Sequence, residues 1–65
     1  MSENPRDSYE LWKAHMRIAI MGASIARECH DMMARGLGAP EVEDMQRFTM
    51  EAGALADLWE ESVPA

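Results

Sequence analysis

The stretch Gly36-Leu37-Gly38-Ala39-Pro40 is the one cluster of helix-breaking residues away from the ends of this 65-residue chain. Glycine readily takes the left-handed backbone that ends a helix, and proline is favoured in the first turn of the next helix. The segments on both sides carry apolar residues at helical spacing, and neither alternates with the period of two that marks a strand. The sequence therefore predicts an all-α fold, an antiparallel two-helix hairpin with helices at about 5–35 and 40–61.

The helix starts carry recognisable signals. The first helix has two candidate starts, either Asn4 as N-cap with Pro5 as the first helical residue, or Asp7 as N-cap answered by Glu10. Pro40 is expected to be the first residue of the second helix.

Apolar residues occupy an unusually wide arc of the first helix. One row keeps the three-four spacing of a coiled coil, and a second row recurs at intervals of seven. The first row comprises Tyr9, Trp12, Met16, Ala19, Ala23, Ala26, His30 and Met33, and the second comprises Leu11, Ile18, Ile25 and Met32. A narrow polar strip is left for Glu10, Lys13, Arg17, Ser24, Arg27 and Asp31. One partner helix cannot cover so wide an arc.

The second helix shows a single main apolar face, which we expect to pack on the first helix. Its members are Val42, Met45, Phe48 or Thr49, Ala52, Leu55 or Ala56, and Trp59. A smaller row, Met50, Ala54 and Leu58, lies on the other side among charges, where a monomer would expose it.

A single hairpin domain spanning residues 1–65 buries too little surface to offset the conformational entropy that its ordering costs. We therefore expect a homodimer that completes a four-helix bundle, or docking on a larger protein. Gly22 weakens the first helix, and a close helix crossing there would give it a role. The residues expected at the interface are Tyr9, Trp12, Met16, Ile18, Gly22, Ile25, Met33, Met45, Phe48, Leu55 and Trp59.

The net charge of −6 is carried by one half of the chain. Residues 1–35 hold five bases and five acids, whereas residues 36–65 hold one base and seven acids. This balance argues against direct binding of nucleic acid or anionic lipid and favours a partner protein with a basic surface. The acids expected to face that partner are Glu43, Asp57, Glu60 and Glu61. Arg6, Lys13 and Arg27, with Arg17 nearby, form a basic edge of the first helix and are expected to form salt bridges with the acidic second helix.

No arrangement of residues predicts catalysis, a cofactor or a metal site. Cys29, His30 and Asp31 are consecutive, and helical neighbours point about 100° apart, so they cannot converge on one ion. The seven methionines are interpreted as core filler and adaptable interface. One cysteine cannot form an internal disulfide, and no segment has the length of a membrane span, so a cytoplasmic location is expected.

Several residues along the chain resemble the short phasin-like proteins of alphaproteobacteria, which associate with polyhydroxyalkanoate granules. The likeness rests on Trp12, the pair Met16-Arg17, the turn 36–40, and Glu43 followed by Arg47-Phe48-Thr49 and Glu51. The resemblance implies an amphipathic helical coat protein on an apolar granule.

Three functions are consistent with these patterns. The first is a non-enzymatic protein that self-associates and binds or regulates a partner protein, with aromatic and methionine anchors. The second is the granule coat that the resemblance implies. The third is an acidic inhibitor of the phage type, which occupies the basic nucleic-acid-binding surface of a host protein.

Overall fold

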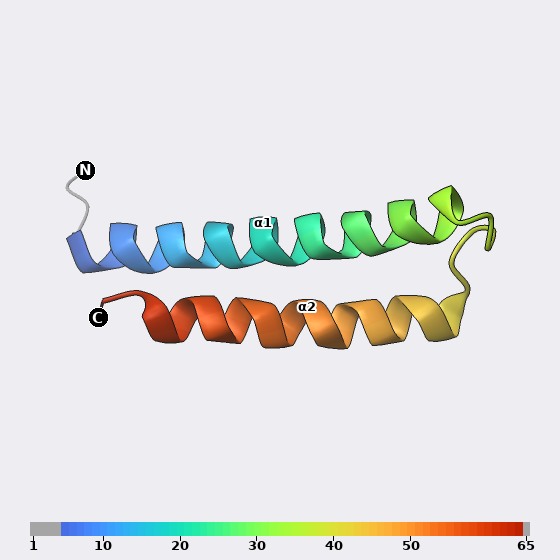
Figure 1. Cartoon of the computed structure of the whole chain (residues 1–65). Helices are drawn as coiled ribbons and strands as arrows, with labels where there is room; N and C mark the ends of the chain where they lie inside the picture. Colours follow the sequence, from blue (N-terminus) through green and yellow to red (C-terminus); the bar gives the residue numbers. More distant parts are fainter. Residues whose placement is uncertain (1–4, 65) are drawn as a thin grey trace.

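The computed structural model describes residues 5–64 and consists of two antiparallel helices, α1 (Pro5–Ala34) and α2 (Val42–Ser62). They lie side by side, with both chain ends together at one end of the hairpin and the turn at the other (Figure 1). The predicted all-α hairpin is confirmed, and residues 5–64 contain no strand.

The turn begins as the glycine pattern predicts. Gly36 has a φ of 75°, in the left-handed region, and its amide donates to the Met33 carbonyl at 3.0 Å. The amide of Leu37 donates to the Met32 carbonyl, also at 3.0 Å. This pair of bonds satisfies carbonyls that the end of α1 would otherwise leave open, and it stops the helix.

The helix starts agree with the expectation in one case and differ in the other. Pro5 is the first residue of α1, and Asp7 lies inside the helix, so the start at Asp7 is wrong; Asn4 is outside the described residues. α2 begins at Val42 rather than Pro40, because Glu41 is its N-cap residue and the Glu41 amide donates to Asp44 Oδ2 at 3.0 Å. The capping interaction, rather than the proline, sets the start.

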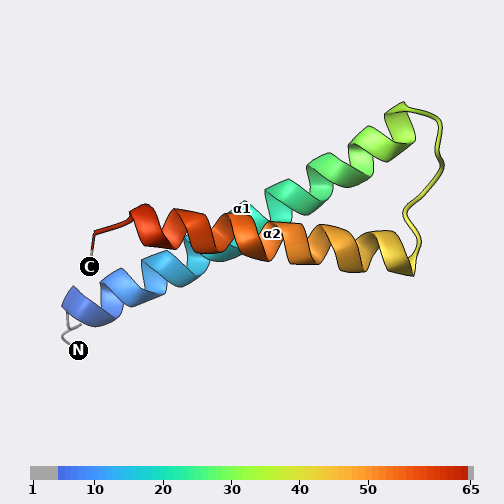
Figure 2. The same cartoon turned by 60° about the horizontal axis from the view of Figure 1, so that its bottom comes forward.

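Three side chains of α2, Phe48, Ala52 and Ala56, are the buried residues of the described chain. They follow one another at intervals of four. Rows with this spacing are inclined to the helix axis, and helices that pack through them cross at an angle. Figure 2 shows the two helices crossing near their middles. The predicted face of α2 is therefore correct for these three residues, whereas Val42 and Leu55 turn out to be exposed.

α1 turns a different face toward α2 from the one predicted. Lys13, Arg17 and Ser24, from the narrow polar strip, are half-buried. Arg17 pairs with two acids of α2, whereas Lys13 lies over the Tyr9 ring and pairs with Glu10 of its own helix. The predicted coiled-coil row is exposed over most of its length, at Trp12, Ala19, Ala23, Ala26, His30 and Met33.

The hairpin is elongated and leaves much of its surface open. It measures 51 × 25 × 18 Å, with a radius of gyration of 15.3 Å, where a compact chain of this length has about 11 Å. Its accessible surface is 5206 Å², where a compact monomer of 7.3 kDa exposes about 4,200 Å². The two helices thus leave roughly 1,000 Å² per chain that a compact fold would cover.

Candidate interaction site

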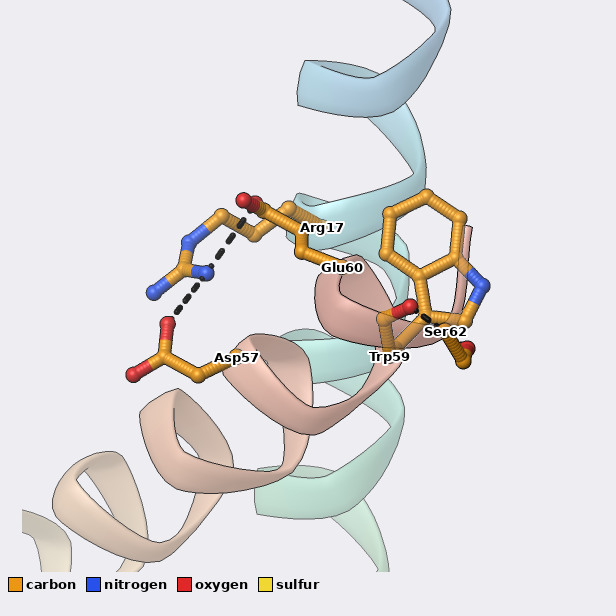
Figure 3. A network of polar contacts seen from close by, with 5 residues as sticks. All are labelled: Arg17, Asp57, Trp59, Glu60 and Ser62. Carbon is orange, nitrogen blue, oxygen red and sulfur yellow. Dashed lines mark hydrogen bonds and ion pairs between the residues drawn. The ribbon is translucent and has the colours of Figure 1, made fainter. Parts of the chain in front are cut away.

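One arginine of α1 links the two helices through two carboxylates of α2 (Figure 3). Arg17 Nη1 donates to Asp57 Oδ1 at 2.7 Å and to Glu60 Oε1 at 3.1 Å. The hydrogen bond to Asp57, followed by the one to Glu60, raises the pKa of Arg17 above its ordinary value. The predicted salt bridge from α1 to the acidic helix is confirmed at Arg17, whereas Lys13 pairs with Glu10 of its own helix at 3.5 Å.

This contact involves Asp57 and Glu60, two of the acids that were expected to face a partner protein. The carboxylates of Asp57 and Glu60 form ion pairs with Arg17 of the same chain. Glu43 and Glu61 are exposed and have no ion pair with the rest of residues 5–64. A basic partner would therefore meet these two first.

An aromatic cluster closes the end of the hairpin where the chain ends meet. The Tyr9 and Trp12 rings stack with centroids 5.7 Å apart, and the Trp12 and Trp59 rings lie 5.6 Å apart with a 60° tilt. The Tyr9 hydroxyl donates to the Pro64 carbonyl, which ties the segment after α2 to the start of α1. Stacked and tilted aromatic pairs contribute about 0.5–1.5 kcal/mol beyond their buried area, so this cluster stabilises the hairpin itself.

The side chains of Cys29, His30 and Asp31 have different neighbours. Cys29 Sγ lies 3.7 Å from Met45 Sδ of α2, His30 is exposed, and Asp31 pairs with Arg35 at 3.2 Å. Within residues 5–64, no three His, Cys, Asp or Glu side chains gather where they could hold a metal ion.

A shallow apolar hollow lies beside the start of α2. Val42, Met45 and Met50 are among the residues that line it. Its other lining residues are Pro40, Glu41, Gln46 and Thr49. The hollow is open to solvent on one side, so it can accept an apolar side chain of a binding partner but cannot enclose a small substrate.

The side of α1 turned away from α2 carries an exposed row without Asp, Glu, Lys or Arg, which we call the outer α1 face. Ile18 keeps 68% of its surface exposed, Leu11 56% and Met33 55%. At about 100° per residue, the row lies roughly opposite the half-buried residues of α1. Its members are Leu11, His15, Ile18, Gly22, Ala26, His30 and Met33.

α2 also has an exposed apolar row, as predicted for a monomer: Met50, Ala54 and Leu58. Met50 is 76% exposed and Leu58 64%. Glu43, Glu51 and Glu61 are exposed on the same helix, so acids accompany this row along its length, which is not the case for the outer α1 face.

The predicted interface residues fall into three groups. Phe48 is buried inside the hairpin and is not available to a partner. Four are half-buried, at Tyr9, Met16, Ile25 and Trp59. Six are exposed, at Trp12, Ile18, Gly22, Met33, Met45 and Leu55. Sequence reasoning missed His15, Ala26 and His30 as neighbours of Ile18 and Gly22 on one exposed row.

Neither helix of the described chain combines the length and apolarity needed to cross a bilayer. No family model matches the chain, and no curated protein or solved structure shows significant similarity to it.

Proposed function

We propose that this chain is a non-enzymatic interaction protein that self-associates and binds a partner protein. The single observation that supports this proposal best is the balance of covered and open apolar surface. Three residues are buried, whereas ten large hydrophobic side chains are exposed. Exposed apolar rows of this extent are typical of protein interaction surfaces.

Two surfaces with different chemistry suit two kinds of contact. The outer α1 face is apolar and uncharged, which suits a partner that buries it. The outer surface of α2 combines an apolar row with unpaired acids, Glu43 and Glu61, which suits a basic protein surface. Charge complementarity of this kind speeds association and selects the partner.

Affinity capture from the native cell extract, at low and high salt, tests the partner-binding part. We expect a basic protein to be retained at low salt and lost at high salt, because exposed ion pairs are screened. The double variant Glu43→Gln/Glu61→Gln should retain less of it, whereas Asp7→Asn, which removes an exposed acid from the first turn of α1, is the control. Capture that is independent of salt and of both variants would contradict an acidic docking surface.

A granule coat is a second candidate, supported by the exposed rows on the outer sides of both helices. An amphipathic helix binds an apolar surface through such a row and needs no protein partner. Flotation of the purified chain with polyhydroxyalkanoate granules distinguishes the two candidates. Co-flotation without any added protein would favour the coat, and its absence would favour the interaction protein.

A further inference from the structure

The residues of the outer α1 face are arranged nearly symmetrically on the two sides of Gly22. Leu11 and Met33 are each eleven positions from it, and Ile18 and Ala26 are each four. His15 and His30 are seven and eight positions away. Reversing the helix therefore places similar side chains at similar heights. A surface that pairs with its own copy across a two-fold axis must match itself in this way.

The charge distribution favours the same pairing. The net charge of −6 belongs to residues 36–65, so two copies must keep their α2 helices apart. Packed helices lie about 9 Å apart, so contact through α1 separates the two α2 axes by roughly 27 Å, about three Debye lengths at physiological salt. Contact through the outer α2 row would instead bring the two acidic helices to about 9 Å.

The open area matches what a stable dimer needs. Standard interfaces bury about 800 Å² on each partner, and each chain exposes roughly 1,000 Å² more than a compact monomer of its mass. The row from Leu11 to Met33 spans about 33 Å along α1, long enough to supply an interface of this size.

Gly22 lies where two such helices would cross. Apart from the adjoining residues and the nearby backbone of α1 itself, a Cβ at this position would meet no atom within 4 Å, so no contact with α2 requires glycine there. Glycine inside a helix costs about 1 kcal/mol relative to alanine. Close approach of a second α1 would explain why a glycine occupies this position, which the contacts of the single chain do not explain.

We propose that a second copy of this chain docks on the outer α1 face, antiparallel, α1 against α1, with the two-fold axis at Gly22. The proposal rests on the self-association proposed above and adds its surface and direction. Leu11 of each copy then faces Met33 of the other, and Ile18 faces Ala26. The four helices form a layer with the α1 helices inside and the acidic α2 helices outside, rather than a closed bundle.

Site-specific cross-linking tests the direction of the pairing. In a Cys29→Ser background, single cysteines replace Leu11 in one preparation and Met33 in another. Mild oxidation of the mixture should give the heterodimer 11–33′, while each variant alone gives little product. Fast cross-linking of Leu11→Cys to itself would overturn the antiparallel direction. Val42→Cys, 72% exposed, serves as the control for random collision.

Sedimentation equilibrium of two further variants tests the surface. Ile18→Glu places a charge at the centre of the pairing and should raise the dimer dissociation constant about a hundredfold or more. Met50→Glu, on the outer α2 row, should leave it unchanged. A dimer that survives Ile18→Glu and dissociates with Met50→Glu would overturn the proposal while leaving self-association intact. A native chain that sediments as a monomer would contradict both this proposal and the self-association on which it rests.

Discussion

Replacing Phe48 by alanine is the substitution that the structure predicts to be most damaging. Phe48 is 1% exposed and is the one large side chain that the hairpin buries completely. The Arg47 guanidinium carbon lies 5.1 Å from the ring centroid and covers the ring from the solvent side. Removing a buried phenyl group costs about 3–5 kcal/mol, and a two-helix core next to solvent can partly collapse, so we expect about 3 kcal/mol. A chain of this length has a free energy of unfolding of roughly 3–10 kcal/mol, so a large part of it is lost.

Urea unfolding followed by circular dichroism measures this loss, with protein concentration held constant because association would add to the apparent stability. Met50→Ala is the matched control, since Met50 is on the same helix and is 76% exposed. Its midpoint should stay near that of the native chain. Equal midpoints for Phe48→Ala and Met50→Ala would refute the assignment of Phe48 as the centre of the core.

Three further predictions concern the ion pair, the N-cap and the glycines. Arg17→Met should lower the melting temperature at low salt and lose this effect at high salt, whereas Arg35→Met, whose ion pair with Asp31 is local to the end of α1, should change little. Because the pKa of Arg17 is raised, the contribution of its own charge is complete below its ordinary pKa and is lost as the pH rises through the raised value. Asp44→Ala removes the acceptor for the amide of the N-cap residue Glu41 and should cost about 1 kcal/mol in urea unfolding. Gly36→Ala should destabilise the protein by about 1–2 kcal/mol because φ is 75° at this position. Gly53→Ala, in helical backbone with open space around it, should stabilise the protein by up to about 1 kcal/mol. Equal effects of the two substitutions would contradict the turn geometry.

The helical hairpin could be predicted because its signals are local. Gly36 and Pro5 act through the backbone of their own neighbourhood, so their positions predict where α1 ends and begins. The predicted start of α2 at Pro40 is two residues too early, because Glu41, which is not a preferred N-cap residue type, is the N-cap. This depends on the bond from the Glu41 amide to Asp44, which the proline signal does not contain.

The packing face of α1 could not be predicted from apolarity alone. Its apolar arc is wide enough to contain several faces, and a three-four row assumes helices that cross at a shallow angle. The contact instead follows four-residue rows, with Ala52 and Ala56 in the core and Arg17 held by Asp57. Opposite charge on α2 thus favours a face of α1 that includes Arg17 of the narrow polar strip.

This choice of face is also what leaves the outer α1 face open. Had α1 packed through its coiled-coil row, Ala19, Ala23 and Ala26 would have been covered by α2. They are exposed, and so is Gly22 beside them. Sequence reasoning placed Ile18 and Gly22 at an interface, but the nearly symmetrical row to which they belong became visible only when the position of α2 was known.

The molar mass of the native chain in solution tests the central claim most directly. Sedimentation equilibrium at micromolar concentration should give about twice the chain mass of 7.3 kDa, with a melting temperature that rises with protein concentration. A mass of 7.3 kDa together with a cooperative melt that does not depend on concentration would contradict the claim that this hairpin completes its core by self-association.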